Sequence, residues 1–100
     1  MTPRLFVRAD AAADIEAAAA WYEERRRGLG GEFVRAVRAA LAGIAREPLR
    51  FPAARGEVRR ARVRRFPYVI FFVPEAERTV VLAILHGRRD PQVWQVRADA

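Results

Sequence analysis

Few side chains in this sequence are able to transfer a proton or grip a phosphate group. The only histidine, His86, is followed at once by Gly87, Arg88, Arg89 and Asp90. Arginine binds phosphate oxygens and histidine transfers protons near neutral pH, so this segment is typical of a phosphate-holding site. In the structural alternative, Arg88 pairs with Asp90 and His86 only ends a strand. The residues alone leave both interpretations open.

A second group of arginines lies just upstream, in a segment for which we predict a β-strand over 57–65. Alternate side chains of a strand point to the same face, so Arg60, Arg62 and Arg64 share one face at a spacing of about 7 Å. This spacing predicts a positive track for an anionic partner. The alternative is a solvated edge strand whose charges prevent edge-to-edge aggregation.

The composition excludes most other chemistry. The chain has no Cys, Ser, Asn or Lys, which removes thiol and serine nucleophiles, the lysine Schiff base and the phosphate-loop lysine. One histidine and scattered acids give no metal-ligand spacing, so we expect neither a metal nor a cofactor. All 19 basic residues are arginine against 12 acids, and the net charge of +7 favours nucleic acid or an acidic protein segment as partner.

Length and hydropathy indicate one globular domain over residues 1–100. With 52% hydrophobic residues the chain can build a core of its own. No apolar run approaches the roughly 20 residues that a membrane helix needs, and the N-terminus lacks the layout of a signal peptide. We therefore expect a cytoplasmic protein.

The first half of the chain predicts a short strand followed by a helix hairpin. The strand covers 5–7, and helices are expected over about 11–27 and 31–46, where apolar residues recur at helical spacing. Asp10 is expected to be the N-cap of the first helix and Gly28 its left-handed C-cap. The short link between the helices predicts that they pack antiparallel.

After a loop at 49–56 and the strand at 57–65, two further strands are predicted over 68–73 and 79–86, joined by a turn at 74–78. These two runs are apolar at nearly every position, whereas a hairpin with one wet face alternates apolar and polar residues. Both faces of the sheet are therefore buried, or one face is left for a partner.

The helix hairpin can cover only one face of this sheet. Tyr68, Ile70 and Phe72 share a face, and we expect either these side chains or those between them to be partly exposed and to bind a partner. The alternative is that the C-terminal segment folds back over the sheet, with Trp94 as its anchor.

In this order, these segments resemble the RelE/ParE superfamily of type II toxin–antitoxin toxins, and within it the ParE-like, plasmid-stabilisation branch. The residues that carry the resemblance are Trp21-Tyr22-Glu23, Gly28-Leu29-Gly30 with Phe33, Pro48, Arg65-Phe66-Pro67-Tyr68, Val81-Leu82-Ala83, and His86, Arg88, Arg89, Pro91 and Trp94. The resemblance spans 5–94. It implies an α+β fold in the order β-α-α-β-β-β, with the helix hairpin packed on one face of a mainly antiparallel sheet.

The resemblance also implies a partner and a target. A cognate antitoxin would wrap its C-terminal segment around the toxin in a hetero-oligomer. ParE-like members inhibit DNA gyrase without catalytic chemistry of their own, whereas RelE-like members cut messenger RNA on the ribosome. An enzyme of the second kind would be a metal-independent endoribonuclease.

The RelE-like site is only half matched. Arg62 and Arg64 match its basic residues on the second strand and Arg88 its arginine after the fourth, but Val69 and Trp94 replace its third-strand arginine and its C-terminal tyrosine. An indole N–H donates a hydrogen bond but does not transfer protons in the useful range. The resemblance thus favours a gyrase-binding toxin, with an endoribonuclease that also uses His86 as the alternative. A third interpretation is a stand-alone nucleic-acid-binding module, which would bind in a salt-sensitive manner without toxicity. The expected target-binding residues are Arg60, Arg62, Arg64, Arg88 and Arg89, and the expected antitoxin contacts are Tyr68, Ile70 and Phe72.

Overall fold

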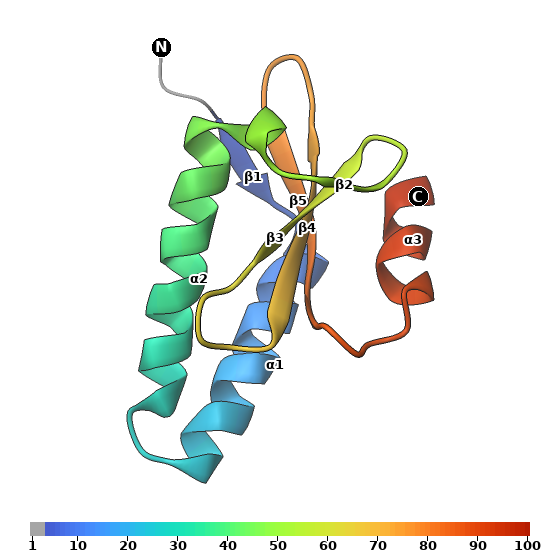
Figure 1. The fold of residues 1–100 in the computed structure, drawn as a ribbon. Helices are drawn as coiled ribbons and strands as arrows, with labels where there is room; N and C mark the ends of the chain where they lie inside the picture. The colour runs from blue at the N-terminus through green and yellow to red at the C-terminus, as the bar shows by residue number, and fades with distance from the viewer. Residues whose placement is uncertain (1–3) are drawn as a thin grey trace.

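The computed structural model describes residues 4–100 as an α+β fold with helices on both faces of a five-stranded sheet (Figure 1). The elements in chain order are β1 (Leu5–Val7), α1 (Ala9–Arg25), α2 (Leu29–Arg46), the 3-10 helix η1 (Pro48–Arg50), β2 (Ala53–Arg55), β3 (Val58–Arg62), β4 (Tyr68–Pro74), β5 (Thr79–His86) and α3 (Gln92–Asp99). The predicted class, with a helix hairpin on a mainly antiparallel sheet, is confirmed. Strand β2 and helix α3 are additions that the sequence analysis missed.

The strands lie in the order β1-β5-β4-β3-β2. Only the pair β1–β5 is parallel, and the chain crosses between these two strands through the helix hairpin and the other three strands. The remaining pairs are antiparallel, with Tyr68 opposite His86 and Arg62 opposite Val69. This register brings the start of β4, the end of β3 and the end of β5 to one end of the sheet.

The helix boundaries differ from the prediction at the start of α1 and in the turn between α1 and α2. Helix α1 starts after Arg8 as its N-cap, so Asp10 lies in the first turn instead of capping the helix. There its carboxylate accepts a hydrogen bond from the Ala11 N–H at 2.9 Å and pairs with Arg8 at 3.1 Å. Gly28 does take the left-handed conformation, with φ 89°, but as the N-cap of α2. An acidic side chain interacts favourably with the helix dipole both at the N-cap and in the first turn.

The turn between the helices is held by Glu23. Its carboxylate accepts hydrogen bonds from the backbone N–H groups of Gly28, at 2.9 Å, and Gly30, at 3.0 Å. These groups belong to the start of α2, where backbone N–H groups have no partner within the helix. Gly30 is buried against α1, close to the backbone of Ala19. These contacts account for Glu23, Gly28 and Gly30 in the two motifs that carry the resemblance.

Replacing Gly30 with alanine is expected to lower the free energy of unfolding by about 1–3 kcal/mol, as overpacking does in tight cores. The added Cβ would lie 2.6 Å from the Ala19 carbonyl oxygen and 3.0 Å from a Glu23 carboxylate oxygen. Urea denaturation measures the change. The matched control is Gly31→Ala, whose Cβ meets nothing closer than an Arg35 side-chain nitrogen at 3.5 Å. We expect the control to be neutral or stabilising, because alanine favours helix; equal losses in both variants would contradict the packing argument.

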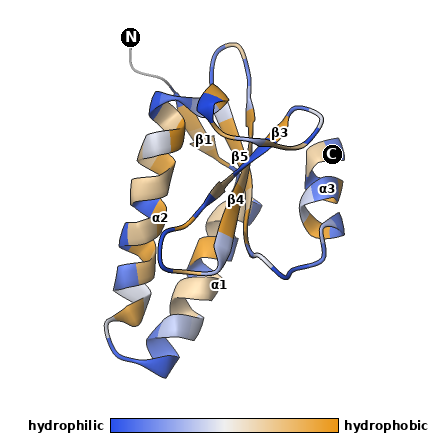
Figure 2. Ribbon diagram, viewed as in Figure 1, coloured by the Kyte–Doolittle hydropathy of each residue, from blue (hydrophilic) through white to orange (hydrophobic). Residues whose placement is uncertain are grey.

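The helix hairpin covers the first face of the sheet, and the orange sides of α1 and α2 in Figure 2 face it. The fully buried residues of this core include Phe33, Ile44, Ile70 and Phe72, each 0% exposed. Ile70 and Phe72 are therefore not exposed, because they lie in the core beneath the helix hairpin. The partly exposed set is the one between them in β4, Val69, Phe71 and Val73, which was the other alternative that the sequence predicted. Tyr68 is partly buried at the lower end of the same face.

The side chains of β5 do not alternate strictly between the two faces, because this strand contains a β-bulge. Phe71 pairs with Ala83 and Phe72 with Val81, which leaves Leu82 as an extra residue on β5. Leu82 and Ala83 consequently both belong to the core cluster of the second face, whereas Val81 belongs to that of the first. A bulge of this kind shifts the facing of every later side chain by one position.

Helix α3 covers much of the second face. Trp94 is 6% exposed and stacks on Phe71 of β4, with ring centroids 4.7 Å apart and an interplanar angle of 12°. Figure 1 shows α3 on the side of the sheet away from α1 and α2. The structure thus has the alternative arrangement, in which the C-terminal segment folds back over the apolar sheet.

An ion pair ties α3 to the opposite layer. Beyond the end of the short strand β1, the Asp14 carboxylate accepts the Ile84 N–H of β5 at 3.0 Å, and Arg97 of α3 donates to the Leu82 carbonyl at 3.0 Å. The same Arg97 and Asp14 bond to each other at 2.6 and 3.1 Å. The hydrogen bond that Arg97 donates to Asp14 raises the pKa of Arg97, so this guanidinium stays charged. Along the edge of β5 beyond β1, these two side chains bond to backbone groups that no strand of residues 4–100 reaches.

Candidate binding surface at the end of the sheet

The candidate site lies where the β3–β4 turn meets the segment after β5. The turn is closed by the Val63 N–H, which donates to the Tyr68 carbonyl at 2.9 Å, and the Gly87 N–H donates to the Pro67 carbonyl at 2.8 Å. These bonds fix the turn and the loop side by side. Side chains that lie far apart in sequence, around residues 60–65 and 86–89, therefore border the same end of the sheet.

A groove of ≈ 930 Å³ runs across this end of the molecule, and we call it the arginine groove. The arginines that line it are Arg60, Arg62, Arg64, Arg65 and Arg88. All five are exposed, and within residues 4–100 none of them pairs with a carboxylate. Unpaired arginines around a groove make a surface for phosphate or carboxylate groups.

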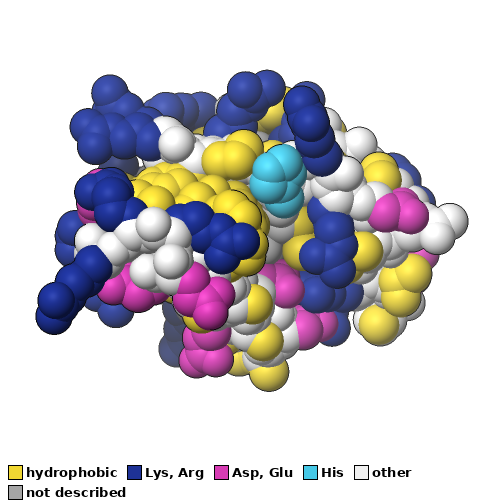
Figure 3. Space-filling view, turned by 90° about the horizontal axis from the view of Figure 1, so that it is seen from below, with side chains coloured by type: hydrophobic (Ala, Val, Ile, Leu, Met, Phe, Trp, Pro, Cys, Tyr) yellow, Lys and Arg dark blue, Asp and Glu magenta, His cyan; other side chains and the backbone are white. Residues whose placement is uncertain are grey.

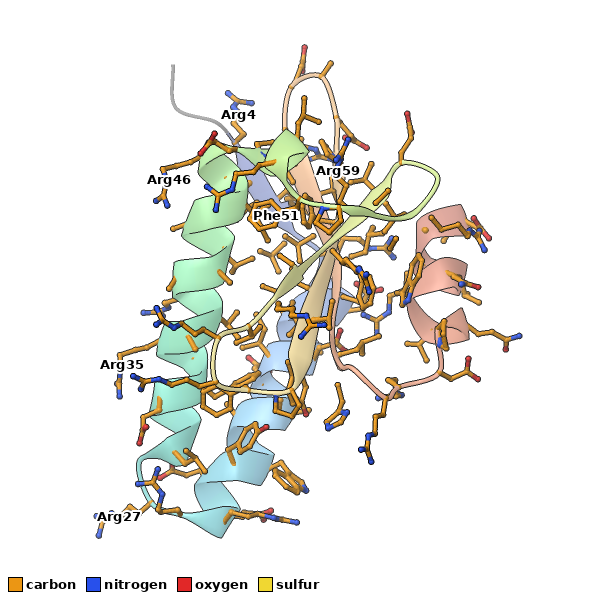
Figure 4. All side chains as sticks on the ribbon, in the orientation of Figure 1. Arg4, Arg27, Arg35, Arg46, Phe51 and Arg59 are labelled. Carbon is orange, nitrogen blue, oxygen red and sulfur yellow. The ribbon has the colours of Figure 1, made fainter. Side chains whose placement is uncertain are left out.

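The predicted strand over 57–65 is too long, since β3 ends at Arg62. Arg64 and Arg65 belong to the turn, yet Arg64 still lines the groove beside Arg60 and Arg62. Arg59 points to the other face and donates to the carbonyls of Leu49 and Phe51, at 3.2 and 2.6 Å, so it holds the loop after η1 (Figure 4). Its role is structural.

Arg65 belongs to the motif Arg65-Phe66-Pro67-Tyr68 but was not among the predicted binding residues. It has φ 74°, the one positive φ at a residue other than glycine in the described chain. An L-residue in this region is strained, and such strain collects at turns and functional sites. Its side chain lines both the arginine groove and a neighbouring hollow against α2. No sequence signal marked this conformation, because arginine is not a residue that favours it.

Arg89 lies on the other side of His86, in a separate hollow of ≈ 550 Å³ that we call the aromatic pocket. Its lining comes from α1, the start of β4 and the end of β5. The lining residues are Asp14, Ala17, Ala18, Trp21, Tyr22, Pro67, Tyr68, Ile84, Leu85, His86 and Arg89. Pro67, Tyr68 and His86 line the arginine groove as well, so the two hollows share a border.

His86 lies on this border, and its ring is held in place. Its Nδ1 accepts the Arg88 backbone N–H at 3.0 Å, and its ring meets Tyr68 edge-on at 5.6 Å. Since Nδ1 accepts, the neutral imidazole carries its proton on Nε2. The ion pair that offered a structural explanation for Arg88 and Asp90 does not form: Asp90 instead accepts the Gln92 N–H at 2.9 Å, at the start of α3.

Figure 3 shows this end of the molecule. The histidine lies beside a hydrophobic patch, with arginine side chains on several sides of both and acidic side chains below the patch. Positive charge, an imidazole and apolar surface are thus adjacent. Within residues 4–100, no three His, Cys, Asp or Glu side chains lie where they could hold a metal ion. The described helices are all too short or too polar to cross a membrane.

An aromatic cluster in the core of the first face packs beneath the site. It consists of Tyr22, Phe33, Phe66 and Tyr68, with centroid distances from 5.0 to 6.1 Å. Burial raises the pKa of both tyrosines above the usual 10.0, and for Tyr22 the neighbouring Tyr68 raises it further. The phenols are therefore neutral at physiological pH, and neither is a base there.

These pKa shifts predict alkaline destabilisation. A group with a raised pKa in the folded state stabilises the fold below its unfolded pKa, and this stabilisation is lost as the pH rises through the folded value. We expect the free energy of unfolding to fall above pH 10, the ordinary tyrosine value. Urea denaturation across that range measures it, and absorbance follows the ionisation, because the chain has only these two tyrosines. The double variant Tyr22→Phe/Tyr68→Phe should lose the slope; an unchanged slope would assign it to other groups.

Comparison with known proteins agrees with this architecture. A solved structure described as the chromosomal ParDE TA system from P. aeruginosa superposes with a TM-score of 0.76 and 18% sequence identity, covering 85% of this chain and 96% of that chain. At this identity the likeness shows the fold alone. No curated protein matches the sequence. The family model described as the ParE toxin of type II toxin-antitoxin system, parDE, matches residues 5–91. Because that match spans most of the chain, the chain belongs to the ParE toxin family of type II toxin–antitoxin systems.

Proposed function

We propose that this protein is a growth-inhibiting toxin that acts in the cytoplasm by binding DNA gyrase and is neutralised by a cognate antitoxin. The observation that carries the proposal is the ParE family match over residues 5–91. The geometry supports binding over catalysis. Trp94, which replaces the proton-transferring tyrosine of RelE-like members, is buried between α3 and the sheet and stacked on Phe71.

The target contact in this proposal is the arginine groove. Arg60, Arg62, Arg64 and Arg88 line it together, and Arg89 lies just across His86. Their charges are not neutralised by carboxylates of the described chain, so they are available to an acidic surface. Clustered, unpaired charges of one sign speed up the encounter with a partner of the opposite sign.

For the antitoxin, Tyr68 is the one member of the predicted trio that remains accessible. It is partly buried and borders both the arginine groove and the aromatic pocket. An antitoxin segment laid over this end of the sheet would cover Tyr68 and the arginines at once, and would thereby block the target site. Ile70 and Phe72 contribute only by supporting this surface from the core.

The experiment is inducible expression in a bacterial host, together with a gyrase supercoiling assay on the purified protein. We expect growth arrest, loss of supercoiling and rescue by the co-expressed antitoxin. Arg62→Gln/Arg88→Gln should relieve inhibition. The matched control Arg27→Gln/Arg46→Gln removes two exposed arginines outside the groove (Figure 4) and should leave inhibition intact. Normal supercoiling in the presence of a toxic protein would overturn gyrase as the target.

One observation favours a second function, a ribosome-dependent endoribonuclease. The structure brings His86 into the same groove as Arg62, Arg64 and Arg88. Histidine can transfer a proton while arginines hold the phosphate. Codon-specific cleavage of ribosome-bound mRNA, lost in His86→Ala and accompanied by normal supercoiling, would establish this function instead. Toxicity that survives His86→Ala would leave the residue a structural one.

A further inference from the structure

The aromatic pocket contains an exposed tryptophan that neither the core nor the arginine groove explains. Trp21 lies on α1 and is 48% exposed, whereas the other tryptophan of the chain is buried. The Arg25 guanidinium stacks on the indole at 3.8 Å, and Tyr22 meets it edge-on at 5.1 Å. The ring is thus held in one orientation while much of its surface stays open to solvent.

The pocket beside Trp21 suits a flat, weakly polar group. Its volume of ≈ 550 Å³ is within the usual range for small-molecule sites, and aromatic rings of Tyr22, Tyr68 and His86 line it. Asp14 is the only acid among the lining residues, and its charge is compensated by Arg97 at 2.6 Å. The remaining charged group in the lining is Arg89, which is positive.

The pocket and the arginine groove form one continuous surface, because Tyr68, His86 and Pro67 line both. A ligand that crosses His86 would have aromatic rings on one side and unpaired guanidinium groups on the other. Unpaired nucleobases stack on aromatic side chains, and the phosphates that link them bind arginine. A duplex keeps its bases stacked on one another and is able to use only the arginines.

We propose that this surface binds single-stranded nucleic acid, with the phosphates along the arginine groove and one base in the aromatic pocket beside Trp21. An acidic protein segment would pair with the arginines of the groove but would have no group that stacks on Trp21. A single-stranded nucleic acid would occupy both the arginine groove and the aromatic pocket, so the two together favour it. This inference goes beyond the proposed function, since it gives the surface a ligand of its own whether or not gyrase is the target.

The test is fluorescence anisotropy with labelled oligothymidylate and oligouridylate of about ten nucleotides, a length within the usual site size of single-strand binders. A duplex of equal length is the comparison, and each titration is repeated over a series of salt concentrations. We expect both single strands to bind more tightly than the duplex, with affinity that falls as salt rises. Binding should also change the fluorescence of Trp21, which is recorded on Trp94→Phe so that only one tryptophan emits.

Variants separate stacking from charge. Trp21→Ala, at an exposed position, is expected to weaken single-strand binding about tenfold and to leave duplex binding unchanged. Arg62→Gln should weaken both and reduce the salt slope by about one counterion, whereas Arg46→Gln, with the same loss of charge at the far end of α2, should change neither. Circular dichroism confirms that each variant is folded.

Three results would overturn the proposal. Equal affinity for single strand and duplex, or no effect of Trp21→Ala, would reduce the binding to non-specific charge. Equal effects of Arg62→Gln and Arg46→Gln would remove the groove from the interaction. Displacement of the oligonucleotide by polyglutamate, with a dependence on both Trp21 and Arg62, would assign the surface to an acidic protein segment. The supercoiling assay is read independently, so either proposal can fail alone.

Discussion

Replacing Ile70 with aspartate is expected to unfold this protein. Ile70 is 0% exposed at the centre of the core between the helix hairpin and the sheet. A carboxyl group there must be protonated or remain charged without a partner. A pKa shift of about 3–5 units at such a site costs about 4–7 kcal/mol, and the lost burial of isoleucine adds about 1.5–3 kcal/mol. The sum is as large as the whole stability of a typical domain.

The matched control is Val96→Asp, because Val96 of α3 is 67% exposed and undergoes the same change from a branched apolar side chain to a carboxylate. Circular dichroism and urea denaturation of both variants measure the difference. We expect Val96→Asp to keep a cooperative transition near that of the parent protein. If Ile70→Asp instead stays folded and only loses its binding to the antitoxin, Ile70 lies on an exposed binding face. The buried packing of Ile70 would then be wrong.

That face illustrates what the sequence did not determine. In β4, Tyr68, Ile70 and Phe72 alternate with Val69, Phe71 and Val73, and both sets are apolar. Alternation identifies a buried face only when the other face is polar, so nothing local indicated which set meets the helices. The amphipathic spacing of α1 and α2 was sufficient to predict the hairpin. It did not predict which side of the sheet the hairpin covers.

Helix α3 escaped prediction for a related reason. Its eight residues, Gln92–Asp99, are mostly polar or small, and only Trp94 among them is fully buried. So short a helix is marginal by itself and is stabilised by its contacts, which here are made with β5 and with Phe71 of β4. Strand β2 has three residues and an irregular register with β3, so it too depends on its neighbour.

The candidate site was predictable where it depends on spacing along one element. Arg60 and Arg62 follow from the two-residue period of β3, and Arg88 from its place just after β5. The aromatic pocket was not predictable, since it joins Trp21 of α1 to the end of β5, more than half the chain away. The Asp14–Arg97 pair, separated by 83 residues, required the fold itself.

Removing one partner of that pair, with Arg97→Met, is expected to lower the free energy of unfolding by about 3–5 kcal/mol. The side chains of Arg97 and Asp14 are 18% and 14% exposed, so the variant leaves a largely buried carboxylate without its counter-charge. The Leu82 carbonyl also loses a donor. Because Arg97 bonds α3 to Asp14 of α1 and to Leu82 of β5, we expect its loss to loosen α3 from the sheet. Trp94 should then become more accessible to a fluorescence quencher.

A double-mutant cycle with Asp14→Asn tests whether the charge pair is responsible. Asparagine keeps an oxygen that can accept the Ile84 N–H, at present 3.0 Å from the Asp14 carboxylate, but carries no charge that needs Arg97. Arg97→Met should therefore cost much less in the Asp14→Asn background, with a coupling energy above about 1 kcal/mol. Costs that simply add would show that α3 is held by the stacking of Trp94 on Phe71 and not by the ion pair. The tryptophan contact buries the larger apolar area, but Arg97 joins α3 to α1 across the edge of β5 through its ion pairs with Asp14, at 2.6 Å, and Asp10, at 3.5 Å. Because the Asp14 pair is the shorter of the two, we expect the coupling.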